Sequence, residues 1–280
     1  MALPFLPFPA YGCARELVAS VPLQLIEGYP IVPARLAGQP VSMLVDTGAQ
    51  GMLVTPEIAA RLQLPLRGLI PVFGTGGQRE ARVVLLPGFR IADTPMPDQL
   101  APVAPLPIDF QLNPPLAGLL GASLLSNFDL DIDVPGRRLS LYAPSDCDAP
   151  FRGTTLPLEV TPQGEPFVPV RINGQELLAL LDTGTRATIL SDETARRLSI
   201  QAPASANMAE GIDGMRRAIG HTRVRLALGN EAAADTPISI SALQLARGDM
   251  LLGLDAFVRR RVWLSYRRGQ VVFGALLQAP

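Results

Sequence analysis

The sequence predicts an all-β protein of two similar lobes, with only short helices. An Asp-Thr-Gly triplet occurs twice, each copy directly follows an apolar run typical of a buried strand, and the residues around the two copies repeat. The triplets begin at Asp46 and Asp182, behind residues 43–45 and 179–181. Burial of a lone carboxylate costs free energy unless the group is paired or hydrogen-bonded. Acids placed directly behind core strands therefore indicate a site.

The internal repeat covers most of the chain. The two aspartates are 136 positions apart, and the same offset places Gly38 on Gly174 and Glu57 on Glu193. The offset falls to 132 where residues 119–121 align with residues 251–253, since both read Leu-Leu-Gly. A period this long describes two whole lobes rather than a solenoid. We expect an amino-terminal arm at 1–16, a first lobe at 17–145 and a second lobe at 146–280.

Two Asp-Thr-Gly triplets, each followed about 70 residues later by two apolar residues and a Gly, resemble the aspartic proteases. Ala49 gives the first triplet the Asp-Thr-Gly-Ala form typical of the retropepsin branch, whose sites are usually built from two identical short chains. The sequence is similar to two such units fused. The resemblance implies a bilobal acid-protease fold of two β-barrel-like lobes related by a pseudo-twofold axis. It also implies an endopeptidase site at the lobe interface.

By this resemblance Asp46 and Asp182 form the catalytic pair. Hydrolysis of a peptide bond without a metal or a covalent nucleophile needs one group to remove a proton from water and another to protonate the carbonyl oxygen. Two carboxyls that share one proton do both, which is the established behaviour of the aspartic-protease dyad. The competing interpretation is a catalytically silent peptide-binding or assembly module on the same fold. Loss of either aspartate would have favoured that alternative.

The neighbours of the two aspartates are expected to support the pair. By resemblance, the threonines interlock beneath the dyad, and the glycines let backbone amides approach the carboxylates. The hydroxyl of Thr185 can donate to its neighbouring carboxylate, whereas Ala49 cannot, which removes a stabiliser of the ionised form on one side. We therefore expect a working pH range less acidic than that of pepsin-like enzymes. The supporting residues are Thr47, Gly48, Thr183, Gly184 and Thr185.

Two Gly-rich segments about 30 residues past the aspartates are interpreted as flaps that close over a peptide. Gly-rich tips between extended arms predict hairpins, and a plain hairpin is the alternative because its local structure is the same. Ile70, Phe73, Ile212 and Met215 are expected to give an apolar lining and a preference for hydrophobic residues at the cut. The flap residues are Phe73, Gly74, Thr75, Gly76 and Gly77 in the first lobe, and Gly211, Ile212, Asp213 and Gly214 in the second.

Short amphipathic helices are predicted at residues 55–62 and 191–198. Thr55 and Ser191 suit the N-cap, and Glu57 and Glu193 place negative charge near the positive end of each helix.

Four other stretches carry expectations. The Pro-rich residues 92–115 predict an extended connector over the surface. Residues 127–134 begin like a calcium loop, but Val134 stands where the loop needs Gly, so a strand with a polar face is predicted. Residues 270–278 predict a strand that closes an interlobe sheet. The arginines at 259–261 and 267–268 are expected to form a solvated surface.

The composition excludes several classes of protein. The net charge of −1 indicates no nucleic-acid partner, and the absence of Lys excludes a phosphate-binding Gly-Lys-Ser/Thr loop. A single His disfavours a His-based zinc site or a Ser-His triad. No apolar run reaches transmembrane length. We expect no metal or other cofactor, a peptide or protein substrate, and a monomer with an internal pseudo-dimer.

Cys13 and Cys147 each precede the first strand of their repeat. The sequence leaves open a disulfide in an oxidising compartment and two free thiols. Residues 1–11 are apolar and Pro-rich and resemble the remainder of a trimmed leader. A periplasmic or secreted location is therefore slightly favoured over a cytoplasmic one.

Overall fold

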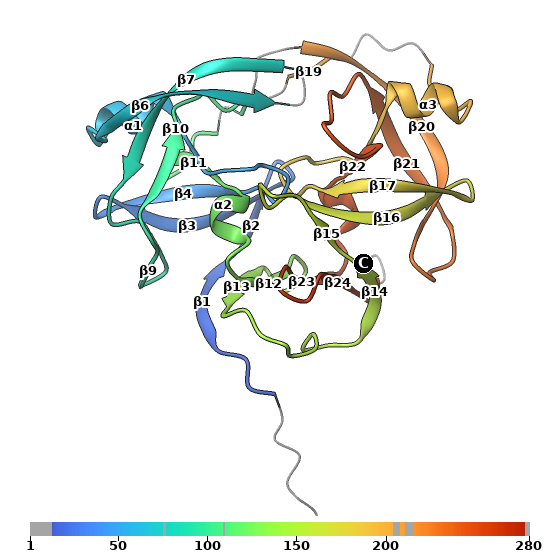
Figure 1. Cartoon of the computed structure of the whole chain (residues 1–280), viewed down its shortest axis with the longest axis horizontal. Coiled ribbons are helices and arrows are strands. Elements are labelled where there is room, and N and C mark those ends of the chain that lie inside the picture. Colours follow the sequence, from blue (N-terminus) through green and yellow to red (C-terminus); the bar gives the residue numbers. More distant parts are fainter. Residues whose placement is uncertain (1–12, 75–76, 109, 204–207, 211–215, 278–280) are drawn as a thin grey trace, which may run out of the picture.

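The computed structural model describes residues 13–74, 77–108, 110–203, 208–210 and 216–277. Two lobes of β-sheet lie side by side above a third sheet that contains strands from both halves of the chain (Figure 1). This architecture confirms the all-β, bilobal prediction. The lobe limits at 17–145 and 146–280 stay a prediction.

The first lobe contains a seven-stranded and a three-stranded sheet. The β3–β4 hairpin turns at Ala37 and Gly38, both with positive φ, as a tight two-residue hairpin turn requires. In the larger sheet β4 runs parallel to β11, so their carboxyl ends meet at one edge. Its strands are β2 (Gln24–Ile26), β3 (Tyr29–Leu36), β4 (Gln39–Val45), β5 (Leu53–Val54), β8 (Arg90–Ile91), β9 (Thr94–Pro95) and β11 (Leu116–Leu120); the smaller sheet has β6 (Leu66–Gly74), β7 (Gly77–Leu86) and β10 (Gln99–Pro102).

The second lobe is one eight-stranded sheet in which β20 pairs with both β16 and β21, which curls the sheet into a barrel-like form. Asn173 and Gly174, with φ of 51° and 83°, form the turn between β16 and β17. As in the first lobe, β17 runs parallel to the strand before the Leu-Leu-Gly glycine, β22. The strands are β15 (Glu159–Val160), β16 (Pro166–Ile172), β17 (Gln175–Leu181), β18 (Ile189–Ser191), β19 (Met208–Glu210), β20 (Arg216–Leu228), β21 (Ala234–Ser241) and β22 (Met250–Leu252).

A six-stranded sheet joins the two halves of the chain in the order β1-β13-β12-β23-β24-β14. The central pair β12 and β23 places Asp131 opposite Trp263. The predicted strands at 127–134 and 270–278 are confirmed as β12 and β24, although β24 ends at Gly274. The members are β1 (Leu17–Pro22), β12 (Asp129–Asp133), β13 (Arg138–Tyr142), β14 (Gly153–Pro157), β23 (Arg261–Ser265) and β24 (Gln270–Gly274).

The polar face of β12 is buried rather than solvated. Asp129 is fully buried and accepts a hydrogen bond from the Ser145 amide at 3.1 Å. Asp131 is 3% exposed and forms an ion pair with Arg261. Side chains on both faces of β12 are buried. Its carboxylates therefore need partners, which come from the neighbouring strand and from the linker between the lobes, residues 143–152 between β13 and β14.

The predicted helices are confirmed as α1 (Pro56–Arg61) and α3 (Asp192–Arg197). Thr55 caps α1 by accepting from the amide of Ile58, and Ser191 caps α3 by accepting from the amide of Thr194. Two further short helices follow the Leu-Leu-Gly segments: α2 (Ala122–Leu125) and the 3-10 helix η1 (Leu254–Ala256).

Two expectations need correction. The Pro-rich stretch 92–115 is not wholly a connector, because β9 and β10 lie in its first half and pair with β8 and β7. The arginine cluster is not wholly solvated: Arg260 is 4% exposed, donates to Glu231 at 2.8 Å, and lies over the ring of Phe273. An arginine is buried when its charge is paired in this way.

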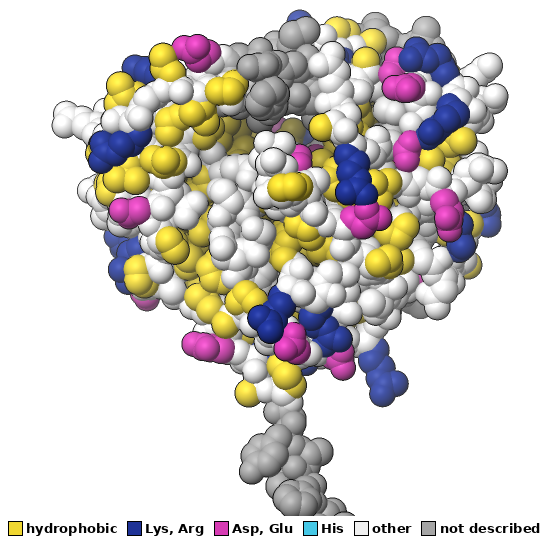
Figure 2. Space-filling view, viewed as in Figure 1, with side chains coloured by type: hydrophobic (Ala, Val, Ile, Leu, Met, Phe, Trp, Pro, Cys, Tyr) yellow, Lys and Arg dark blue, Asp and Glu magenta, His cyan; other side chains and the backbone are white. Residues whose placement is uncertain are grey.

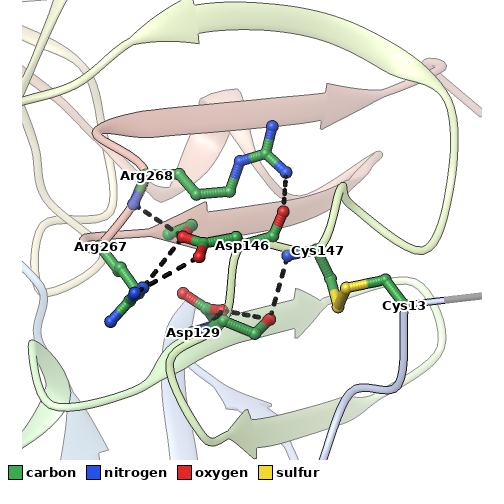
Figure 3. Close-up of polar contacts among 8 residues, drawn as sticks. Cys13, Asp129, Asp146, Cys147, Arg267 and Arg268 are labelled. Carbon is green, nitrogen blue, oxygen red and sulfur yellow. Dashed lines mark hydrogen bonds and ion pairs between the residues drawn. A yellow bond between two sulfur atoms is a disulfide. The ribbon is translucent and has the colours of Figure 1, made fainter.

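Cys13 and Cys147 form a disulfide with a Cα–Cα distance of 5.5 Å, which decides between the two alternatives that the sequence left open. Figure 3 shows that it lies beside a cluster in which Arg267 and Arg268 hold the linker between the lobes. Arg267 donates to the carboxylate of Asp146 at 3.0 Å, and Arg268 donates to the backbone carbonyl of Asp146 at 2.6 Å. The disulfide fastens the linker to the amino-terminal arm, and the arginine contacts fasten it to the β23–β24 turn.

We expect loss of this disulfide to lower the free energy of unfolding by about 2–4 kcal/mol, because the bridge joins residues 134 positions apart and restricts the unfolded chain. Urea denaturation of the wild type with and without reductant measures the change. A Cys13→Ser variant should unfold like the reduced wild type and should not respond to reductant. Equal midpoints for the oxidised and reduced wild type would contradict the prediction.

Candidate active site

The two aspartates occupy equivalent places at the ends of the central strands of the two lobes. Asp46 follows β4 and Asp182 follows β17. Each backbone amide donates at 3.0 Å to the neighbouring parallel strand, Asp46 to the carbonyl of Leu120 and Asp182 to that of Leu252. Each carboxyl therefore begins a loop that leaves the sheet between two parallel strands and turns toward the other lobe.

Thr47 and Thr183 lock the two loops together. Each amide donates at 3.1 Å to the hydroxyl of the other threonine. The Thr47 hydroxyl donates to the carbonyl of Leu181 at 2.6 Å, and the Thr183 hydroxyl donates to that of Val45 at 2.8 Å. Both threonines are fully buried, so these four reciprocal hydrogen bonds satisfy every donor and fix the separation of the loops.

Gly48 and Gly184 bring the backbone of each loop against the opposite carboxyl. A Cβ added at Gly48 would lie 2.6 Å from Cγ of Asp182, and one at Gly184 would lie 2.3 Å from Cγ of Asp46. Real Cβ atoms do not approach this closely, so only glycine fits at either position. The aspartates therefore face each other across the lobe interface, and their carboxyls hydrogen bond to each other.

Backbone amides surround each carboxylate. Asp46 Oδ1 accepts from Gly48 at 3.1 Å and from Ala49 at 3.0 Å. Asp182 Oδ1 accepts from Gly184 at 2.8 Å, and the backbone amide of Thr185 also donates to this carboxyl. The backbone amides of Thr185 and Ala49 thus play equivalent parts in the two loops. The role of the Thr185 hydroxyl stays a prediction.

Burial raises the pKa of both carboxyls. The pKa of Asp46 lies well above its ordinary value of 3.8 because of burial, the charge of Asp182 and the hydrogen bond to that group. Burial raises the pKa of Asp182 to about 6, against the opposing effect of the Gly184 amide, the Asp46 hydrogen bond and the Thr185 amide. Asp182 is 9% exposed and Asp46 is half-buried. The pair therefore holds one shared proton above about pH 6.

These pKa values predict a pH dependence of both cleavage and stability. Below about pH 6 both carboxyls are protonated and no base remains, so kcat/KM should rise with pH through about 6. Since the folded state binds protons more tightly than the unfolded chain, the free energy of unfolding should fall as pH rises above 3.8 and through 6. Asp182→Asn should reduce that slope. An optimum below about pH 3 would contradict the prediction.

Two further glycines hold the loops in place. A Cβ at Gly121 would lie 2.0 Å from the carbonyl oxygen of Gly51, and one at Gly253 would lie 2.4 Å from that of Ala187. Sequence reasoning used the Leu-Leu-Gly repeat as a mark of duplication but missed this packing role. Sequence reasoning also missed two contacts between the lobes, which are made by Gln50 and Arg186. These residues are 136 positions apart, so the repeat could have indicated that they occupy equivalent places.

The hairpin of β6 and β7, whose arms carry the first predicted flap, lies at the end of the molecule opposite the six-stranded sheet (Figure 1). In the first lobe, Gly74 ends β6 and Gly77 begins β7, and the two residues pair across the hairpin. Figure 2 shows that the surface is hollowed between the lobes on this side. Ile70, which was expected in the lining, is 41% exposed.

Phe73 lies in β6, while several predicted flap and lining residues fall outside the described part of the chain: Thr75, Gly76, Gly211, Ile212, Asp213, Gly214 and Met215. The structure places the hairpin arms and does not test these positions.

Among the described residues, no group of three or more His, Cys, Asp or Glu side chains is placed to hold a metal ion. In the same part of the chain, no helix has the length and hydropathy to cross a membrane.

Two β-lobes whose strand ends bring a pair of carboxyls together across an interlocked threonine pair define the class of bilobal aspartic proteinases. Comparison with protein families supports this class in both halves of the chain. Residues 32–124 match the "Aspartyl protease" model, and residues 168–259 match the "gag-polyprotein putative aspartyl protease" model. The chain belongs to the retropepsin-like aspartic proteases.

Curated relatives match one stretch of the chain. Protein DDI1 homolog 2 of Homo sapiens is 32% identical over 111 residues, 39% of this chain, and its Danio rerio counterpart is 31% identical over the same length. The match spans only about a quarter of these relatives, 27% and 26% of their lengths.

Solved structures match the whole fold at low identity. The aspartic proteinase from Irpex lacteus has a TM-score of 0.57 at 12% identity, with 92% of this chain and 97% of that chain covered. Basic 7S globulin from soybean has a TM-score of 0.51 at 14% identity, with 93% and 95% covered. At these identities the likeness shows the fold alone.

Proposed function

We propose that this protein is an aspartic endopeptidase that hydrolyses peptide bonds with a water molecule activated between Asp46 and Asp182. The observation that carries the proposal is the pair of hydrogen-bonded carboxyls, each raised in pKa and each backed by the other lobe's glycine. A purely structural ion-pair network would pair a carboxylate with a cation; a carboxyl pair that shares a proton suits acid–base chemistry.

The pair supplies one base and one acid, and we infer a mechanism with Asp182 as the base. Asp182, ionised above about pH 6, takes a proton from water as the hydroxide oxygen bonds to the carbonyl carbon. Asp46 gives its proton to the carbonyl oxygen. The diol intermediate then collapses: Asp182 returns its proton to the amide nitrogen as the C–N bond breaks, and Asp46 recovers one from a diol hydroxyl. The dyad ends as it began.

Apolar side chains beside the dyad support a preference for hydrophobic residues at the cut. Ala49, next to the glycine of the first loop, is partly buried and packs against a cluster of buried side chains that includes Ile31, Leu44 and Leu119. The equivalent cluster in the second lobe is built on Phe167, Leu180 and Leu251.

A catalytically silent peptide-binding or assembly module remains the second candidate. The observation in its favour is that the same fold occurs in a protein named a globulin as well as in a proteinase. The intact dyad and threonine lock favour the enzyme.

The test is cleavage-site profiling of the purified full chain against a denatured peptide library at pH values from 3 to 8. The proposal expects cuts inside the peptides, flanked by hydrophobic residues, with rates that rise through about pH 6. Saturable peptide binding with no cut at any pH would favour the silent module.

A further inference from the structure

The catalytic centre is nearly symmetric, but a peptide has a direction. The aspartates, threonines and glycines of the two loops all repeat with an offset of 136, so they cannot tell one orientation of a bound peptide from the other. A preferred orientation needs residues that break the repeat close to the dyad. The fourth position after each aspartate does so, because it is Gln50 in the first lobe and Arg186 in the second.

Both residues cross the lobe interface at equivalent places. Arg186 donates to the backbone carbonyl of Glu27 at 3.4 Å, and its guanidinium lies 5.1 Å from the ring centroid of Tyr29. Gln50 donates to Oε1 of Glu165 at 3.3 Å. Tyr29 and Glu165 are themselves 136 positions apart. The two contacts are therefore pseudo-symmetric and flank the dyad on opposite sides.

Arg186 brings a positive charge to one side, and among the described contacts the exposed carboxylate of Glu27 forms no ion pair with it. Its guanidinium is exposed, and the groups it contacts in the described chain, a carbonyl and a tyrosine ring, are uncharged. Gly28 leaves room for it: a Cβ there would lie 3.2 Å from Cδ of Arg186, and the φ of 83° favours glycine. The guanidinium is thus held at the rim of the interface with donors free for a ligand.

Glu165 brings a net negative charge to the other side. The described partners of its carboxylate, Gln50 and the Thr161 hydroxyl at 2.9 Å, are both uncharged. The nearby Glu159 forms an ion pair with Arg247, so these two charges offset each other. The two sides of the dyad therefore differ in the sign of their uncompensated charge.

Arg186 and Gln50 each stand four residues past a catalytic aspartate, and four extended residues span at most about 14 Å. We propose that Arg186 and Glu165 give the site a direction and make it select peptides with an acidic residue on one side of the cut and a basic residue on the other. This inference rests on the proposed endopeptidase function. It concerns residues about three or four positions from the scissile bond.

Three peptides with a shared apolar core test the proposal. The third positions before and after the core carry Glu and Arg in the first peptide, Glu and Glu in the second, and Arg and Arg in the third. Cleavage by the wild type and fluorescence-anisotropy binding to Asp182→Asn are both measured. The mixed-charge peptide should be favoured over each like-charged peptide about three- to tenfold, as expected for exposed charge pairs.

Variants identify the residues responsible. Arg186→Glu should shift the preference to the Arg-Arg peptide, and Glu165→Arg should shift it to the Glu-Glu peptide, because each variant leaves both sides with the same charge. The milder Arg186→Gln and Glu165→Gln should each reduce the preference for the mixed-charge peptide. Arg171→Gln is the matched control, because Arg171 is also exposed and donates to a backbone carbonyl, that of Gly229, at 2.7 Å. It should leave the preference unchanged.

The binding and cleavage readouts separate the two proposals. Oriented binding that follows the Arg186 and Glu165 variants, without any cleavage, would uphold the direction and overturn the endopeptidase. Cleavage of all three peptides at equal rates, or a preference that the Arg186 and Glu165 variants leave unchanged, would overturn the direction and uphold the endopeptidase.

Discussion

Asp182→Asn is expected to lower kcat/KM for peptide cleavage by about a thousandfold or more, the usual contribution of general acid–base catalysis. An amide at this position cannot take the proton from water, and Asp46 keeps its own proton because burial raises its pKa. Asp46→Asn should have a similar effect, since the pair acts as one unit. The double variant should then lose little more than either single variant.

The same substitution should not unfold the protein. The carboxyl of Asp182 is 9% exposed and has a pKa of about 6, so at neutral pH the folded state bears the cost of a buried charge. Asp182→Asn removes that cost, and its midpoint of thermal unfolding at pH 7 should equal or exceed that of the wild type. Asp192→Asn, on the exposed surface of α3, is a control that should keep full activity. Undiminished cleavage by Asp182→Asn would overturn the assignment of the dyad.

Much of the fold could be predicted because the strand, loop and helix-cap patterns of short segments agree with the internal repeat of the whole chain. An apolar strand followed by Asp-Thr-Gly predicted both the strand end and the loop behind it. Thr55 and Ser191 predicted where the helices begin, because an N-cap is a local hydrogen bond that depends on a few neighbouring residues. The repeat extended each such prediction to the second lobe.

What could not be predicted depends on contacts between distant residues. The spacing of Cys13 and Cys147 does not indicate that their Cα atoms lie 5.5 Å apart. The sequence predicts a surface position for Arg260, because its contacts with Glu231 and Phe273 are visible only in the structure. In each case the tertiary structure outweighed a local preference.

The candidate site falls between these two cases. The residue types and their repeat predicted which residues the site contains. The interlobe contacts of Gln50 and Arg186 needed coordinates, because a partner 115 or 159 positions away leaves no local pattern. These contacts also show how a fused chain differs from two identical ones. Equivalent positions can diverge, so the two sides of one site can acquire opposite charge.

Gly184→Ala is expected to reduce cleavage by about a hundredfold or more while the lobes stay folded. The new Cβ would stand 2.3 Å from Cγ and 2.4 Å from Oδ2 of Asp46, so the carboxyl must rotate away from Asp182. A displacement of about 1 Å in a reacting group is enough for a loss of this size. Gly48→Ala should act in the same way on Asp182, where the new Cβ would stand 2.6 Å from Cγ.

Gly51→Ala is the matched control, because it lies in the same loop as Gly48. Its Cβ would meet Ser123 Oγ at 3.9 Å, an ordinary contact, so activity should stay within a few-fold of the wild type. Thermal unfolding beside the kinetics separates the outcomes: displacement of a reacting carboxyl lowers kcat while the unfolding transition is kept, whereas a general loss of fold removes or broadens that transition. Wild-type kcat in Gly184→Ala would mean that the carboxyls need not meet across the interface. The dyad mechanism would then have to be abandoned.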